Sequence, residues 1–425
     1  MKTQRILAFI TGMLAYGFAT LLQAQPLSIE AARASAIADN PGLAEMQARF
    51  AALREVVPQQ AALPDPVLSF GAMNFPWDEF DRNQENMTQL QVGVSQMFPY
   101  PGKLQLREDI AAFEAEVARH SVEEMRIRLD LNVTSTWWEI YFIDRSLETV
   151  LRNQDLLRQF VDIAKKKYEV GKGLQQDVLL AQLELSKLLD QEIRIAALRE
   201  HKQTGLNVLM GRSPAHAIQL AGVSEAQLPP LASQETLYAR ALAARPVLHA
   251  KRSTLQASES RLELAKKQYY PDFKVGVTYG NRDDDDLGQS RQDFLSLMVS
   301  VNVPLYTGSK QDRAVQQHSR ELEKSRYALA DERNLVMSSV TMATTDFSRA
   351  VEQVSLYKQG IIPQARQTVA SMQAGYQVDE VDFLNLVRSQ ITLLNYELQY
   401  LKSYTEMNQA IARLVAAVGE DYVYE

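Results

Sequence analysis

The stretch Thr88–Lys103, TQLQVGVSQMFPYPGK, decides how the rest of this chain is interpreted. Apolar side chains fall at every second position of its first half, and this period of two is the signature of a β-strand. Pro99-Tyr100-Pro101-Gly102 then ends the strand, because proline donates no hydrogen bond to a neighbouring strand and glycine permits a reversal. A helical pattern follows at once. The stretch therefore predicts a strand that leads directly into a helix.

The same pattern returns in the second half of the chain. Residues 294–303 alternate in the same way, Pro304–Lys310 forms a second turn, and another long helical pattern begins. So long a period with only two copies indicates a duplication rather than a solenoid. The residues that recur at nearly constant offsets are Pro41 and Pro246, Gly102 and Gly308, Tyr168 and Tyr376, and Gly211 and Gly419.

The duplication defines the predicted organisation of the chain. Residues 1–24 are a signal peptide, 25–211 the first repeat, 212–232 a linker, 233–419 the second repeat and 420–425 a tail. Each repeat is predicted to run helix, two strands, long helix, turn, helix.

The composition limits the possible classes of function. The chain has 425 residues, 46% of them hydrophobic and 23% charged, with a net charge of −7. Such an acidic chain lacks the basic footprint that nucleic-acid binding requires. The absence of cysteine excludes disulfides, thiolate nucleophiles and thiolate metal sites.

The N-terminus reads as a secretory signal peptide. Lys2 and Arg5 precede the apolar run Ile6–Leu22, and Ala24 is a small residue suited to the cleavage site. An uncleaved N-terminal membrane anchor is the alternative. Beyond residue 24 there is no apolar run of about 18 residues, so no transmembrane helix is expected in the mature protein.

The helices are expected to be long. Residues 28–62 predict one alanine-rich helix, and neither proline nor glycine interrupts 104–168. From residue 129 onward apolar positions step by three and four, which is typical of coiled-coil packing, and about 65 residues make a helix of roughly 100 Å. Gly171-Lys172-Gly173 predicts a tight turn into an antiparallel helix over 175–210.

Four strands are expected, each about nine to eleven residues long, a length that spans a bilayer. An open four-stranded sheet cannot sit in lipid alone, because its edges carry unpaired backbone groups, and small membrane barrels need about eight strands or more. Three chains would supply twelve strands. The predicted strands are Val67–Phe75, Thr88–Phe98, Phe273–Gly280 and residues 294–303.

The predicted fold class is therefore a mixed α/β membrane protein. A trimeric 12-stranded β-barrel, apolar outside and polar inside, is continued into the periplasm by an α-helical barrel of long antiparallel coiled-coil helices. The alternative is a soluble helical protein with two incidental hairpins, but it leaves the strand alternation, the signal peptide and the helix length unrelated.

The whole arrangement resembles the TolC-type outer-membrane efflux proteins. The resemblance rests on the duplication, on the Pro-Asp dipeptides before the strands, and on Tyr168-Glu169-Val170-Gly171 followed by Asp177-Val178-Leu179. It implies an exit duct of a tripartite efflux pump in the outer membrane of a Gram-negative bacterium. The implied partners are two further copies of the chain, a periplasmic membrane-fusion adaptor protein, an inner-membrane pump and outer-membrane lipid.

Three functional readings stay open within and beyond this family. The turn Phe98–Lys103 most resembles the branch associated with heavy-metal pumps of the resistance-nodulation-division type, which implies metal cations as cargo. A type I protein-secretion duct is the second reading. A non-conducting structural coiled-coil protein of the periplasm is the third, and conductance in a planar bilayer separates it from a duct.

The resemblance also carries candidate functional residues at the two helical hairpin tips, Tyr168–Asp177 and Tyr376–Leu386. It implies a hydrogen bond from Tyr376 to Asp177 that holds the duct closed, and an adaptor contact at Tyr168, Gly171 and Gly173. The positions at which well-known members carry a ring of aspartates fall on Asn385 and Arg388. The acidic cluster Asp379, Glu380 and Asp382 stands just before them and would attract cations. Solvated turns and charges that favour a helix start are the alternatives.

No enzymatic chemistry is expected. The histidines, at positions 120, 201, 216, 249 and 318, have no spacing suited to a metal site, and no phosphate loop or nucleophile elbow is present. The acidic stretches Asp283–Asp286 and Asp78–Glu85 fall in the predicted extracellular loops and read as solvated, with calcium binding as the alternative. No cofactor is predicted, and Trp137-Trp138 reads as core packing.

Overall fold

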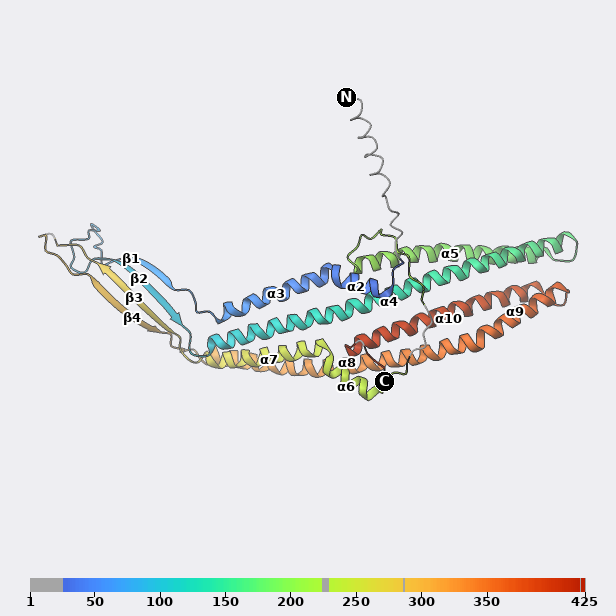
Figure 1. Cartoon of the computed structure of the whole chain (residues 1–425). Coiled ribbons are helices and arrows are strands. Elements are labelled where there is room, and N and C mark those ends of the chain that lie inside the picture. The colour runs from blue at the N-terminus through green and yellow to red at the C-terminus, as the bar shows by residue number, and fades with distance from the viewer. Residues whose placement is uncertain (1–25, 224–228, 286, 421, 425) are drawn as a thin grey trace, which may run out of the picture. The chain divides into compact units, whose positions relative to one another are not determined.

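The computed structural model describes residues 26–223, 229–285, 287–420 and 422–424 (Figure 1). The predicted signal peptide and Asp286 lie outside this range. The strands are β1 (Val67–Met73), β2 (Gln89–Phe98), β3 (Phe273–Asn281) and β4 (Phe294–Val301). The helices are α2 (Ile29–Asp39), α3 (Pro41–Ala61), α4 (Lys103–Glu169), α5 (Gln175–Leu209), α6 (Gln234–Ala244), α7 (Pro246–Lys267), α8 (Gln311–Leu356), the π-helix η1 (Tyr357–Ile361), α9 (Ile362–Gln377) and α10 (Phe383–Val418).

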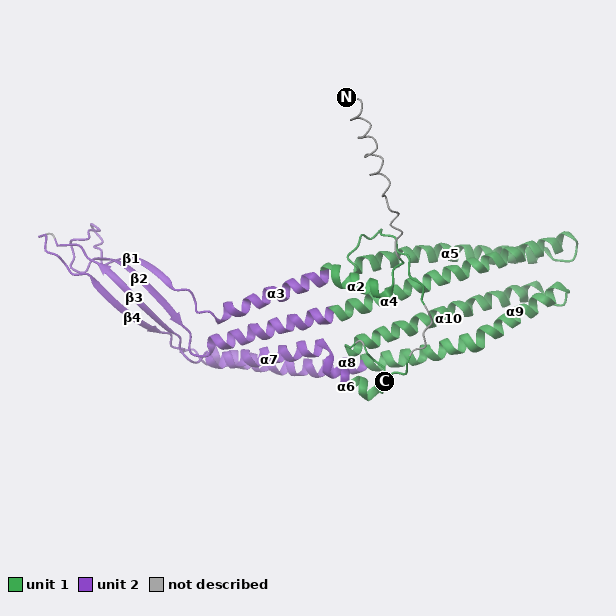
Figure 2. Ribbon diagram, in the orientation of Figure 1, with its two compact units in different colours: residues 1–41, 126–239, 339–425 green, residues 42–125, 240–338 purple. Residues whose placement is uncertain are grey.

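The chain forms two compact units, and each combines segments from both sequence repeats (Figure 2). The sheet unit consists of residues 42–125 and 240–338. The hairpin unit consists of residues 1–41, 126–239 and 339–425, so far as they are described. The units differ from the repeats because strands and helices of one repeat pair with those of the other.

The sheet has the order β1-β2-β3-β4 with every neighbouring pair antiparallel. Its register aligns the alternation of all four strands, so that the two faces differ in chemistry. One row across the sheet is Leu68, Val94, Val277 and Leu297, and the next is Ser69, Gly93, Thr278 and Ser296. We call these the apolar face and the polar face. The apolar face is open: Leu295 and Leu297 are 76% and 72% exposed.

Two strands are shorter than expected. β1 ends at Met73 rather than Phe75, because Asn74 takes the left-handed backbone conformation with φ of 59°. β4 ends at Val301 rather than Val303, before Asn302 and Pro304. The expectation of nine to eleven residues per strand is therefore wrong for β1, with 7 residues, and β4, with 8.

The single helix predicted over residues 28–62 is also wrong, because the chain breaks between α2 and α3. Asn40 has an extended backbone with ψ of 118°, the conformation that a following proline favours, and Pro41 then begins α3. Arg245 and Pro246 repeat this break between α6 and α7 in the second half. Pro41 and Pro246 thus mark equivalent helix starts.

An apolar core in the hairpin unit is shared by α4, α5, α9 and α10. A polar layer interrupts it, where the Gln390 side chain donates to Asn153 Oδ1 at 2.8 Å and Gln154 donates to Glu192 at 2.7 Å. Gln154, an exception to the apolar seam in the sequence, is 1% exposed. Satisfied polar residues in a coiled-coil core fix the register of the helices at some cost in stability.

The second long helix is not continuous. Between α8 and α9 the backbone widens into the π-helix η1, closed by the Ile362 N–H bonding to the Tyr357 carbonyl. Pro363 follows directly and cannot donate, so a regular α-helix would leave a carbonyl unpaired one turn earlier. The helical pattern of the sequence does not predict this interruption.

A buried ion pair joins α4 to β3 within the sheet unit. The Lys103 side chain is 1% exposed, and its ammonium donates to Asp272 Oδ1 at 2.8 Å and to the Tyr270 carbonyl at 2.9 Å. The Tyr100 N–H donates to the same carboxylate at 2.7 Å. Burial would raise the pKa of Asp272, but these bonds from Lys103 and Tyr100 outweigh it and lower the pKa. This junction fixes the turn from strand to helix that the opening stretch predicts.

We expect Asp272→Asn to destabilise the protein by about 3–5 kcal/mol, because it leaves the Lys103 ammonium buried without a counter-charge. Thermal unfolding in detergent measures the loss. Glu263→Gln is the matched control: Glu263 pairs with Lys266 in the open, at 56% and 52% side-chain exposure, and such pairs contribute about 0–1 kcal/mol. Equal losses of stability from the two substitutions would show that the buried pair contributes no more than the exposed one.

Candidate functional site at the helical hairpin tips

The first hairpin tip joins α4 to α5. Gly171 has φ of +74°, and the Lys172 N–H donates to the Lys167 carbonyl at 2.8 Å. Helix α4 therefore ends at a glycine in the left-handed conformation. Gly173 lies so close that a Cβ there would be 3.1 Å from the Tyr168 nitrogen. The two predicted turn glycines are therefore required by the backbone. Tyr168 is 48% exposed at this turn.

The second hairpin tip joins α9 to α10 through a turn of the same length, residues 378–382. Asp379 takes the left-handed conformation with φ of 64°, although it is not glycine. A Cβ on Gly375 would lie 2.5 Å from Val381 Cγ2, so glycine lets the turn fold back on α9. Asp382 has an extended backbone and begins α10. The turn projects Asp379 and Glu380 from the hairpin as exposed carboxylates.

Lys167 links the two hairpins at their tips. Its ammonium donates to the Tyr376 carbonyl at 2.7 Å, forms an ion pair with Asp379, and lies 4.2 Å from the centroid of the Tyr376 ring. The side chain is only 19% exposed. A cation over an aromatic face and charge-assisted hydrogen bonds reinforce each other when water is partly excluded. Lys167 therefore makes three contacts from α4 to the other hairpin.

The structure does not contain the predicted hydrogen bond between Tyr376 and Asp177. The Tyr376 hydroxyl is buried and has no hydrogen-bond partner among the described residues. The ring packs against Phe383, with centroids 5.2 Å apart, and Lys167 covers its face. Burial raises the pKa of Tyr376, and the charges of Asp177 and Asp379 raise it further. Asp177 thus acts on Tyr376 through its charge in this structure.

Asn385 and Arg388 lie on α10, beyond the turn that carries Asp379. Asn385 and Arg388 are exposed and line a cavity of about 490 Å³ between α9 and α10, together with Met372 and Thr368. They lie on the side of α10 away from Phe383, which belongs to the shared core. The structure therefore brings Asn385 and Arg388 together, but separates them from the Lys167–Asp379 pair.

The sequence contained a signal for Lys167 that the analysis missed. Lys166 and Lys167 stand in the last turn of α4, where basic residues are expected simply to favour the helix dipole. The acidic cluster at the second tip is their natural counterpart. Opposite charges on two tips of a duplicated hairpin would have been enough to predict a bridge, but which lysine forms it depends on the packing.

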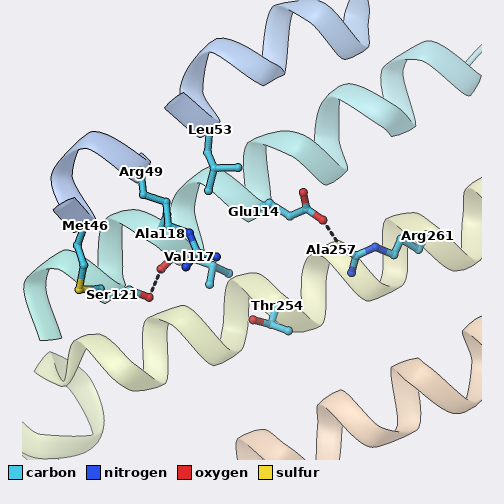
Figure 3. Close-up of a pocket in the computed structure, with 10 residues that line it drawn as sticks. All are labelled: Met46, Arg49, Leu53, Glu114, Val117, Ala118, Ser121, Thr254, Ala257 and Arg261. Carbon is cyan, nitrogen blue, oxygen red and sulfur yellow. Dashed lines mark hydrogen bonds and ion pairs between the residues drawn. The ribbon is translucent and has the colours of Figure 1, made fainter. Parts of the chain in front are cut away.

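A second cavity, of about 370 Å³, lies in the sheet unit between α3, α4 and α7 (Figure 3). Arg261 forms an ion pair with Glu114 across one wall, and Met46, Leu53 and Val117 contribute apolar surface. Throughout the described residues, no three His, Asp or Glu side chains are placed to hold a metal ion. The Ser121 hydroxyl, also in the lining, donates to the Val117 carbonyl at 2.7 Å.

Comparison with known proteins decides the family. The Outer membrane efflux protein family matches the chain twice, over residues 32–212 and 237–420. The chain belongs to the outer membrane efflux protein family. It is an outer-membrane channel protein of the type that extends into the periplasm, and the two matched segments follow the duplication in the sequence.

Individual relatives are distant but match over most of the chain. The cobalt-zinc-cadmium resistance protein CzcC of Cupriavidus metallidurans is 19% identical over 396 residues, 93% of this chain and 91% of the relative. The outer membrane protein TolC of Vibrio cholerae is 23% identical over 319 residues, 72% of each chain. The solved outer-membrane channel OprN shares the fold with a TM-score of 0.79 at 15% identity, covering 92% of this chain and 89% of that one.

We expect Lys167→Met to raise the resting conductance of the channel in planar bilayers, because it removes the ammonium that bonds Tyr376 and Asp379. Lys166→Met is the matched control, since Lys166 is exposed one residue away. Tyr376→Phe should change little, because the hydroxyl has no hydrogen-bond partner in the part of the chain that the structure describes. A large effect of Tyr376→Phe with none from Lys167→Met would restore the bond to Asp177 as the link.

The tip contact should withstand mild acid. The hydrogen bond and charge of Lys167 lower the pKa of Asp379. The carboxylate is therefore ionised, and stays paired with Lys167, at every pH above the usual aspartate pKa. The contact is lost only as the pH falls through the lowered pKa of Asp379. Resting conductance should therefore stay constant from pH 7 down to about 4.5, above the usual aspartate pKa of about 3.9. A rise that begins near pH 6 would contradict this assignment.

Proposed function

We propose that three copies of this chain form the exit duct of a tripartite efflux pump. The observation that carries the proposal is the four-stranded sheet with one apolar face, one polar face and two unpaired edges, β1 and β4. Three such sheets joined edge to edge make a twelve-stranded barrel, and closure satisfies the edge hydrogen bonds that lipid cannot. The polar face then lines the passage.

The apolar face supports contact with lipid. Its side chains stay exposed in the single chain, with Leu297 72% and Val299 61% exposed, which is costly in water and favourable in a bilayer. No helix within the described ranges combines the length and the apolarity needed to cross a membrane. The sheet is therefore the part of the chain that we assign to the outer membrane.

The hairpin tips are proposed as the periplasmic entrance. Lys167, Tyr376 and Asp379 hold the two hairpins of one chain together, and three copies of this contact would bias the entrance toward closure. Asn385, Arg388, Glu380 and Asp382 are proposed to line the passage at this level. Tyr168, Gly171 and Gly173, at the first tip, are proposed to contact the periplasmic adaptor, and the inner-membrane pump acts through it.

Heavy-metal cations are the proposed cargo. A relative matched over 93% of this chain is named for cobalt, zinc and cadmium resistance, and the exposed carboxylates at the second tip favour cations near the entrance. Metal sensitivity of a strain that lacks this chain, restored by the wild-type protein, tests the assignment. Unchanged tolerance to all three metals together with a lost secreted protein would favour a type I secretion duct.

We expect Val299→Arg and Ser300→Arg to differ sharply, because neighbouring strand residues face opposite sides of the sheet. An arginine at position 299 should cost about 2–4 kcal/mol of insertion if it lies near the bilayer midplane, whereas one at position 300 should insert normally and lower cation conductance. Mass analysis of the detergent-extracted protein gives the oligomeric state. A stable monomer, or equal insertion defects, would overturn the trimeric barrel.

A further inference from the structure

Two loops follow the strands at the same end of the sheet, and arginine side chains bind them to each other. Outer loop 1 comprises residues 74–88, and outer loop 2 comprises residues 282–285 and 287–293. The Arg291 guanidinium donates to the Glu85 and Asn83 carbonyls at 3.1 and 3.2 Å. The Arg282 guanidinium donates to the Asn86 carbonyl at 2.5 Å. Outer loop 2 thus holds three backbone carbonyls of outer loop 1.

The contact is reciprocal. Arg82 of outer loop 1 pairs with Asp283 of outer loop 2 at 3.0 Å and donates to the Asn281 side chain at 3.0 Å. Arg282 also bonds to the Gln292 carbonyl of its own loop at 3.1 Å. Hydrogen bonds from a guanidinium are charge-assisted and directional, so these contacts fix the loops as one body rather than merely bringing them close.

The side of the sheet on which this body lies follows from the register. Gly71, Gln91, Gly280 and Phe294 form one row, two residues from the row of Ser69, Gly93, Thr278 and Ser296. Phe294 therefore lies on the polar face, since side chains two residues apart share a face. The Arg282 guanidinium stacks 4.5 Å from the centroid of the Phe294 ring. The Arg282 guanidinium therefore lies on the polar side of the sheet.

Burial agrees with this placement. Thr88 and Gln89 are 2% and 7% exposed, and Gly280 is buried beneath the Gln89 side chain. On the apolar face at the same level, Leu295 is 76% exposed. The loops therefore cover the end of the polar face and leave the apolar face open.

We propose that outer loops 1 and 2 form a lid over the outer mouth of the duct, and that Arg282 and Arg291 hold it shut. The proposal rests on the proposed function, because the polar face lines the passage only if the barrel closes. Each chain would contribute one lid, which must swing away from the polar face before a large solute can leave.

Accessibility of a single cysteine tests the lid, since the chain has none of its own. Ser296→Cys places the reporter on the polar face just below Phe294, and Leu297→Cys places one on the apolar face. A membrane-impermeant polyethylene-glycol maleimide is added to intact cells that express the full-length protein. We expect Arg291→Ala and Arg282→Ala each to speed labelling of Ser296→Cys at least fivefold.

Arg320→Ala is the matched control, because it removes an arginine of the same unit that is 83% exposed on α8 and pairs only within its own helix in the contacts described. It should leave the labelling rate unchanged. If the Arg282→Ala protein does not assemble into trimers, the Arg291→Ala protein alone tests the lid. The described contacts of Arg291 are its bonds to the Glu85 and Asn83 carbonyls. Labelling at the wild-type rate in an assembled Arg291→Ala trimer overturns the lid.

The two reporters separate failure of the lid from failure of the duct. In a duct, Leu297→Cys reacts with a lipid-soluble maleimide and Ser296→Cys with a water-soluble one once the lid is weakened. If both cysteines prefer the same reagent in every background, the faces are misassigned and the duct itself fails. If the faces differ but the arginine variants do not change the rate, only the lid fails.

Discussion

Backbone hydrogen bonds at the edges of a small sheet constrain this protein more than any side chain does. β1 and β4 are the two edges of the sheet, and each has one side along which no strand of the described residues pairs with it. Water could satisfy the backbone groups along these edges, but the apolar row through Leu68, Val94 and Leu297 is suited to lipid, where water is absent. Only association through the edges reconciles the two requirements, and the duplication supplies two hairpins per chain for that purpose.

The turn from sheet to helix places a second demand on the chain. A strand must stop within a few residues and a 67-residue helix must begin, and the buried pair of Lys103 with Asp272 satisfies the backbone and side chains at that point. The Pro-Asp dipeptide before β3 thereby has a physical role, because the aspartate accepts bonds from Tyr100 and Lys103. An apolar junction would give neither direction nor register to the helix.

Arginine and lysine act in the same way at the hairpin tips and at the outer loops. Lys167 bonds a carbonyl, a carboxylate and an aromatic face of the opposite hairpin. Arg282 likewise bonds carbonyls and stacks on Phe294. Such contacts are strong enough to define a closed geometry, yet each depends on one cation and can be broken without disturbing a core. We propose that contacts of this kind allow the duct to open.

Local chemistry determined much of the fold. The alternation in Thr88–Phe98 and its copy predicted the strands and their two faces, and the three-and-four spacing predicted the long helices, because each pattern repeats over many residues. The turn glycines Gly171 and Gly173 were also readable. The break at Pro41 could have been read from the proline alone, whereas the π-helix at Tyr357–Ile361 could not.

Tertiary structure decided the contacts made by single residues. The sequence placed Tyr376 and Asp177 at the correct tips, but packing turned the Tyr376 ring under Lys167 and left its hydroxyl with no hydrogen-bond partner among the residues described. It also paired loop arginines with carbonyls about 200 positions away, as in Arg291 with Glu85. A repeating pattern averages over many side chains and survives small shifts, whereas a hydrogen bond depends on a few tenths of an ångström. Sequence therefore specified the elements and their faces, and the folded chain alone chose the contacts between them.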